Sequence, residues 1–154
     1  MPTSRERKAA RPPTRVPGGP LDEDPRARCA DQPDPQLLEG IAEFNAGRFF
    51  EQHETLETLW RDTRTPVRGL FHGILQIGVG FHHWGRGNHH GAETLLGEGI
   101  ERLGPFAPVC QTIDVAALIA DAGAARDALL RLGPSRMGEY DLGAAPRVRR
   151  VGDR

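Results

Sequence analysis

The 154-residue sequence contains very little cysteine and serine. Its two cysteines, Cys29 and Cys110, are too few and too scattered for a disulfide framework or a cysteine-based zinc site, and we expect both to be incidental. The serines are Ser4 and Ser135, both near the ends of the chain. Neither lies in a nucleophile motif, so the sequence gives no support to a serine or cysteine hydrolase.

A long hydrophobic run is also missing. The most apolar stretch, residues 69–81, includes His72 and Gln76 and is too short to cross a bilayer. The first residues, Met-Pro-Thr-Ser-Arg-Glu-Arg-Lys, contain no apolar segment of the kind that a signal peptide needs. We therefore expect a cytoplasmic protein with no membrane contact.

The charge distribution separates the ends of the chain from its middle. Residues 35–132 carry eight basic and twelve acidic side chains, which gives a net charge of −4. A nucleic-acid surface draws on clustered lysine and arginine, so we expect no nucleic-acid partner for this part.

Eight of the thirteen prolines fall within the first 35 residues, among arginine, aspartate and glycine. Such a segment has too few apolar side chains to offset the entropy lost on ordering. We expect residues 1–34 to be a disordered Pro/Arg-rich tail, residues 35–132 to form the folded domain, and residues 133–154 to be a second disordered tail.

The apolar pattern of the middle part is helical nearly throughout, with large apolar residues recurring every three or four positions. Asp34 and Asn88 are suitable N-caps, and Thr65 before Pro66 is a further start signal. No segment alternates apolar and polar residues as a strand would. We predict an all-α bundle of about five helices. They run over about residues 35–46, from 49 to between 62 and 64, and over about 66–84, 88–103 and 114–132, with the third helix, apolar on nearly every side, at the centre.

Candidate site residues lie on the second and third predicted helices. His53 and Glu57 are one turn apart on a face that also carries apolar residues, and a buried polar group without a partner costs several kcal/mol. On the third helix, His72, Gln76, Val79 and His83 fall within about 60° of arc. If the two helices are antiparallel neighbours, His53 and Glu57 face Gln76 and His83.

Imidazole nitrogen and carboxylate oxygen are zinc ligands, so His53, Glu57 and His83 form a candidate site for zinc, iron or manganese. Two other interpretations remain open: a metal-free network that fixes the register of the helices, and metal-free acid–base chemistry. His82, His89 and His90 are expected at the surface or rim. Glu54 follows His53 as in part of the His-Glu-x-x-His zinc-protease pattern, and it is a candidate general base for metal-activated water.

The chain resembles a family of bacterial and archaeal proteins known as domain of unknown function 309. The resemblance covers residues 36–104. It rests on Phe44-Asn45-x-Gly47-x-Phe49-Phe50-Glu51-x-His53-Glu54-x-Leu56-Glu57-x-x-Trp60, then Gly73-x-x-Gln76 with His83, and then Gly87-Asn88-x-x-Gly91-Ala92. It implies a helical fold and metal binding by the His and Glu of the His-x-x-x-Glu-x-x-Trp hallmark, without a substrate or a reaction. His72 stands where we expect glutamine and His82 where we expect an aromatic residue, so neither inherits a role.

The sequence thus supports two functions. One is a divalent-metal site between helices with possible hydrolase activity, in which Trp60 walls the pocket and Asn88 caps the adjacent helix. The other is a protein-interaction module whose His/Glu/Gln network is structural. The partner is a small molecule or a protein of unknown identity, and the oligomeric state is open.

Overall fold

Five α-helices form the part of the chain that the structure, a computed structural model, describes, residues 22–152. They are joined by short connections and by one small hairpin, and the all-α prediction is confirmed. The helices are α2 (Pro35–Asn45), α3 (Phe49–Asp62), α4 (Arg68–Gly85), α5 (His89–Leu103) and α6 (Val115–Arg136).

Three helices begin at residues whose side chains accept a hydrogen bond from the first turn. Asp34 Oδ1 accepts from the Gln36 amide at 2.7 Å, and Asn88 Oδ1 accepts from the Gly91 amide at 2.9 Å, so both predicted caps are confirmed. Asp114 does the same for Ala117 at 3.0 Å. The predicted cap at Thr65 is wrong: a turn intervenes, α4 starts at Arg68, and no side chain caps it.

Two of the breaks between helices occur at glycines with left-handed backbone angles. Gly47, between α2 and α3, has φ of 77°, and Gly87, between α4 and α5, has φ of 76°. Residues with a Cβ rarely adopt these angles, so glycine at these positions lets the chain reverse within a few residues. The helices on either side therefore pack antiparallel to each other.

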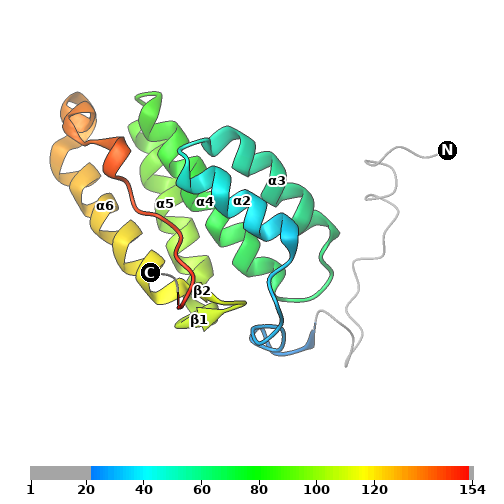
Figure 1. The fold of residues 1–154 in the computed structure, drawn as a ribbon. Helices are drawn as coiled ribbons and strands as arrows, with labels where there is room; N and C mark the ends of the chain where they lie inside the picture. The colour runs from blue at the N-terminus through cyan, green and yellow to red at the C-terminus, as the bar shows by residue number, and fades with distance from the viewer. Residues whose placement is uncertain (1–21, 153–154) are drawn as a thin grey trace.

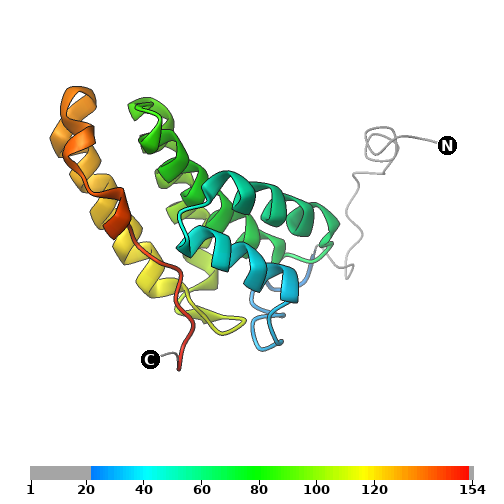
Figure 2. The ribbon, with the colours of Figure 1, turned by 45° about the horizontal axis from the view of Figure 1, so that its top comes forward.

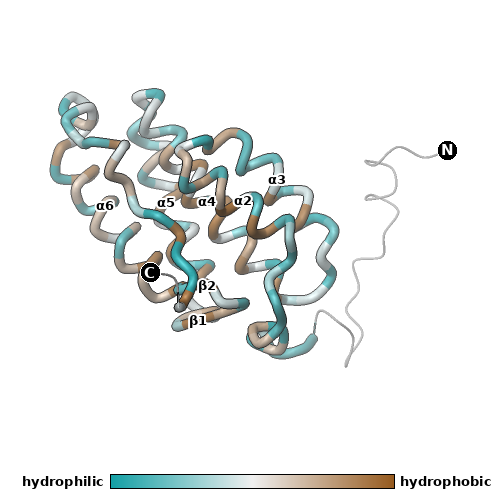
Figure 3. The backbone as a smooth tube through the Cα atoms, in the orientation of Figure 1, coloured by the Kyte–Doolittle hydropathy of each residue, from teal (hydrophilic) through white to brown (hydrophobic). Residues whose placement is uncertain are grey.

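Helix α4 is the central element, as predicted. It lies between α3 and α5 and packs against both (Figures 1 and 2). Hydrophobic and hydrophilic residues both occur along the helices, as expected where one side of a helix is buried and the other is exposed (Figure 3). The buried residues of α4 are Leu70, Phe71, Gly73, Ile74, Leu75, Gln76, Ile77, Gly78, Gly80, Phe81 and Trp84.

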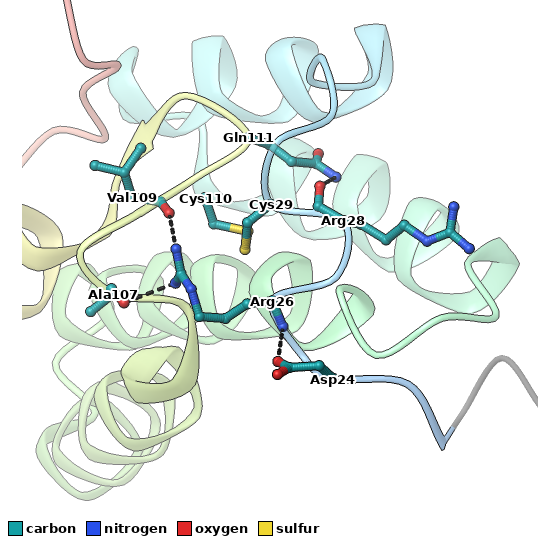
Figure 4. The surroundings of a disulfide bond; sticks show 8 residues. All are labelled: Asp24, Arg26, Arg28, Cys29, Ala107, Val109, Cys110 and Gln111. Atoms are coloured by element: carbon teal, nitrogen blue, oxygen red, sulfur yellow. Dashed lines mark hydrogen bonds between the residues drawn. A yellow bond between two sulfur atoms is a disulfide. The ribbon is translucent and has the colours of Figure 1, made fainter. Parts of the chain in front are cut away.

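The segment before α2 is part of the fold from residue 22 onward, because the two cysteines are joined. Cys29 forms a disulfide with Cys110, which is fully buried in a hairpin made of β1 (Val109–Cys110) and β2 (Ile113–Asp114). The Arg26 guanidinium also donates to the carbonyls of Ala107 and Val109, both at 2.8 Å (Figure 4). The expectation that the cysteines are incidental is therefore wrong, since spacing in the sequence carries no information on contacts across 81 residues.

The segment after α6 also packs on the domain, which extends past the predicted boundary at residue 132. Regular helix is interrupted at Gly133, where φ is 73°, and two short 3₁₀ helices follow, Met137–Glu139 and Leu142–Ala144. The chain then runs back along α6 toward the hairpin, where Arg150 bridges to Ile113 (Figures 1 and 2). The Trp84 indole donates to the Met137 carbonyl at 2.9 Å, and Val148 is 3% exposed.

The predicted tails thus belong to the fold over residues 22–34 and 133–152, and their remaining parts, residues 1–21 and 153–154, lie outside the described residues. Within residues 22–152, no helix has the length and hydrophobicity that a bilayer crossing requires.

Candidate functional site

One line of α4 residues runs between α3 and α5 and is only partly covered. We call it the α4 stripe: Arg68, His72, Gln76, Val79 and His83, spaced three or four residues apart. Gln76 is buried, and the other four are partly exposed. Trp60 of α3 contacts this stripe, and so do Glu98 and Arg102 of α5. The candidate site is therefore a partly exposed polar surface formed by the α4 stripe and these neighbours, which we call the α4 surface.

His53 and Glu57 form a pair on α3. His53 Nε2 lies 3.2 Å from Glu57 Oε2, and the other carboxylate oxygen lies 3.4 Å from Arg61 Nη1. The side chains of His53 and Glu57 are 37% and 41% exposed, so the pair lies at the surface and not in the low-dielectric interior that we expected. A surface pair of this kind contributes about 0–1 kcal/mol to stability.

Trp60 lies between two partners from α4. The Arg68 guanidinium is 4.5 Å from the centre of the indole ring, within the range of a cation–π contact. The His72 ring centre is 4.7 Å from that of Trp60. Arg68 Nε also donates to the Trp60 carbonyl at 3.3 Å. Trp60 therefore contacts both a cation and an imidazole of α4 near the end of α3.

His72 has the most perturbed imidazole of the site. Its pKa is lowered to about 4, mainly by burial and also by Arg102 and Arg68, while Glu57 acts in the opposite direction. The imidazole is thus neutral at pH 7. From the sequence we expected no role for His72. The sequence feature that could have indicated a role is its position one turn before Gln76 on the same stripe.

Gln76 connects α4 to α5 and not, as we expected, to the hallmark residues on α3. Its Nε2 donates to Glu98 Oε1 at 3.2 Å, and its Oε1 accepts from Arg102 Nε at 2.9 Å. Both ends of the buried amide are therefore satisfied by charged partners, which makes a well-paired cross-link between the helices.

His83 lies at the far end of the stripe and has a different partner. Its Nδ1 is 3.3 Å from Asn88 Nδ2, the residue that caps α5. Its pKa is lowered, mainly by burial and then by His82 and Arg86. The structure therefore joins His83 to Asn88 and His82, while His53 is joined to Glu57.

The predicted metal ligands are thus brought together only in part. Within residues 22–152, no group of three or more His, Cys, Asp or Glu side chains is placed to hold a metal ion. His53 and Glu57 supply two donors, and His83 does not complete a set with them. Glu54, the candidate general base, is exposed on α3. The metal site stays a prediction, and this geometry gives no metal-dependent step.

Two residues that we missed are buried polar groups. Gln52, next to His53, is fully buried, and its Nε2 donates to the Leu75 carbonyl at 3.2 Å. His89, which we expected at the surface, has a side chain only 15% exposed, and its Nε2 is 3.1 Å from the Leu129 carbonyl. Both contacts join residues that are distant in sequence, so helical periodicity alone does not reveal them.

The comparison with known families agrees with the resemblance seen in the sequence. Residues 37–95 match the sequence model of a domain of unknown function, DUF309. This range runs from α2 into α5 and contains His53, Glu57, Trp60, His72, Gln76 and His83. Both cysteines, α6 and the C-terminal segment lie outside it. No curated protein matches the chain.

Proposed function

We propose that the chain is a protein-interaction module that uses the α4 surface to bind an acidic segment of a partner protein. The observation that carries this proposal is the cluster of a partly exposed Trp60 in contact with Arg68 and His72, with Arg102 bound to Gln76 one turn further along the α4 stripe. Tryptophan and arginine are the residues most enriched at interface positions that dominate binding energy.

Arg102 has capacity for a ligand. Its Nε is used by Gln76, and its two Nη atoms have no hydrogen-bond partner within residues 22–152. A planar guanidinium binds a carboxylate through two parallel hydrogen bonds, so an acidic side chain fits these Nη groups. After burial, Arg102 and Arg68 are the groups that lower the pKa of His72, so both guanidinium groups act on this part of the α4 surface.

The polar network itself supports a binding role. Gln76 is fully paired with Glu98 and Arg102, and Glu57 is paired with His53 and Arg61. The buried amide of Gln76 thereby orients Arg102 on the α4 surface. Groups fixed in advance lose less entropy on binding, which favours affinity.

Peptide titrations followed by NMR test this proposal. Acetylated hexaglutamate is expected to shift the Trp60 indole and the amides of Arg68 and Arg102 in a saturable way, and hexaglutamine and hexalysine are not. Arg102→Gln should weaken hexaglutamate binding at least fivefold. Arg131→Gln, which removes an exposed arginine on α6, is the matched control and should bind normally.

Two results would reject the proposal: no saturable binding of hexaglutamate, or equal binding by Arg102→Gln and Arg131→Gln. The function that the sequence analysis placed first, a metal-dependent hydrolase, rests on the His53–Glu57 pair in this structure, and a metal measurement tests it separately.

A further inference from the structure

An open cavity of about 330 Å³ lies between the segment before α2 and the connection from α3 to α4. Its apolar side is formed by Leu59, Val67 and Phe71. The opposite side is formed by residues of the segment that the disulfide holds, and by Gln111 at the turn of the hairpin. Residues inside the family match, 37–95, therefore form one side of the cavity, and residues outside the match form the other.

Gln111 is the unusual residue of this cavity. Its side chain is 5% exposed, and its Nε2 donates to the Arg28 carbonyl at 3.3 Å. Its Oε1 is buried and has no hydrogen-bond donor within the described residues. Figure 4 shows the amide reaching from the hairpin toward the Arg28 backbone. A buried carbonyl oxygen without a donor costs about 1–3 kcal/mol. A ligand that donates a hydrogen bond to Gln111 Oε1 would remove this cost.

The backbone at this turn is held in an uncommon conformation. Gln111 has φ of 48° and Thr112 has φ of 67°, both in the left-handed region. The Gln111 amide donates to the Cys29 carbonyl at 2.7 Å, and the adjacent Cys110 carries the disulfide. Non-glycine residues in this region cost about 1 kcal/mol or more each and persist where the surroundings fix them. The surroundings thus fix the position from which Gln111 reaches the cavity.

The charges of the cavity wall favour a hydrogen-bond donor with positive charge. Asp31 and Asp34 both line the cavity. Arg28 also lines it, but its guanidinium is engaged by Glu23, with Nε at 3.0 Å from Oε1. Asp34 uses Oδ1 to cap α2. The Asp31 carboxylate accepts no hydrogen bond within residues 22–152, although it interacts electrostatically with Arg28. The wall, which also includes Gln32, Thr63 and Thr65, therefore carries two carboxylates and one guanidinium beside an apolar floor.

We infer that this cavity binds a primary ammonium group carried on a short apolar body. The ammonium donates to Gln111 Oε1 and pairs with Asp31, and the apolar body packs on Leu59, Val67 and Phe71. None of the α4-surface residues lines this cavity, so the inference does not depend on the proposed interaction function.

Three ligands of nearly equal shape test the inference in NMR titrations of the full, oxidised chain at pH 7: 2-phenylethylamine, 2-phenylethanol and phenylacetate. We expect the amine to give saturable shifts at the Gln111 side-chain amide and at Asp31. It should bind at least tenfold more tightly than the alcohol, and phenylacetate should not bind. A further titration with Nα-acetyl-lysine amide distinguishes a free amine from a lysine side chain of another protein, according to which of the two binds more tightly.

Two variants connect the binding to the proposed contacts. Gln111→Leu should weaken amine binding at least tenfold because the acceptor is removed. Asp31→Asn, an exposed position that leaves the hairpin intact, should also weaken it, and Asp127→Asn on α6 is the matched control. The inference is overturned if phenylacetate binds as tightly as the amine, if the shifts lie elsewhere, or if both Gln111→Leu and Asp31→Asn bind the amine like the control.

Discussion

The side-chain amide of Asn45 pairs with both main-chain polar groups of Val148, 103 residues further along the chain. Its Nδ2 donates to the Val148 carbonyl at 2.9 Å, and its Oδ1 accepts from the Val148 amide at 2.8 Å. Asn45 is the last residue of α2, and Val148 is buried near the end of the chain. This pair fastens the C-terminal segment to the first helix of the domain.

Asn45→Ala should release that segment. The amide and carbonyl of Val148 would lose their partner, and the expected loss of stability is about 1–3 kcal/mol. Hydrogen exchange should show faster exchange over residues 142–150 with little change in α4. Glu39→Gln, an exposed change on the same helix, is the control. Unchanged exchange in the C-terminal segment would show that the Asn45 contact does not hold it.

The disulfide between Cys29 and Cys110 predicts a chain without free thiols. Protein unfolded and alkylated without reductant should gain no iodoacetamide adduct, whereas reduced protein should gain two. Replacing both cysteines by serine should lower the free energy of unfolding by about 2–4 kcal/mol, because the bond closes a long loop. Two adducts before reduction would contradict this pairing.

Gly78 is required where α3 and α4 meet. A Cβ at this position would lie 2.6 Å from Gln52 Cδ, and Gln52 is fully buried. Gly78→Ala should therefore cost about 1–3 kcal/mol in chemical denaturation. Gly123→Ala on α6, where a Cβ meets nothing within 4 Å, should be neutral or stabilising by up to about 1 kcal/mol. Equal effects of the two substitutions would show that close packing does not select glycine at Gly78.

His72 makes stability depend on pH in a defined direction. Its pKa is about 4 in the folded chain and lies near 6.5 when unperturbed, so between these values the unfolded chain binds more protons. Stability should therefore fall as the pH decreases from 6.5 toward 4. His83, whose pKa is also lowered, acts in the same direction.

His72→Gln removes one of these two groups. In urea denaturation at pH 7 and pH 5, the variant should lose less stability between the two conditions than the original chain. His90→Gln, at an exposed histidine on α5, is the control and should behave like the original. An equal loss in His72→Gln and the original would indicate that His72 is not protected from protonation.

The metal hypothesis is tested by elemental analysis of untagged protein, because an affinity tag itself binds metals. If His53 and Glu57 are ligands, zinc, iron or manganese should be present at close to one ion per chain. It should then fall at least tenfold in His53→Ala and remain in His90→Gln. Negligible metal in all three samples would remove the metal site and the hydrolase that depends on it.

Much of the fold follows from local chemistry. The bounds of α2, α3 and α5 agree with the predicted bounds to within a residue or two, because Asp34 and Asn88 cap helices and Gly47 and Gly87 break them. The start of α4 was missed because Thr65 and Pro66 suit either a helix start or a turn. The two-residue strands of the hairpin are too short to leave a pattern in the sequence.

The candidate site was predictable only in its parts. Helical spacing placed His72, Gln76 and His83 on one stripe, and it placed Glu57 one turn after His53. Whether Gln76 turns toward α3 or α5 depends on the rotation of α4 about its axis, which packing against both neighbours decides. In the observed rotation, the Gln76 side chain hydrogen-bonds to Glu98 and Arg102, and His83 contacts Asn88.

The sequence by itself determined the helices, their breaks and the central place of α4, because capping, glycine and apolar periodicity act over a few residues. Tertiary structure alone decided that Cys29 meets Cys110, that Asn45 holds Val148 and that Trp60 lies between Arg68 and His72. Two of these contacts join residues more than 80 positions apart. All three depend on how complete helices and segments pack, and local composition carries no record of that packing.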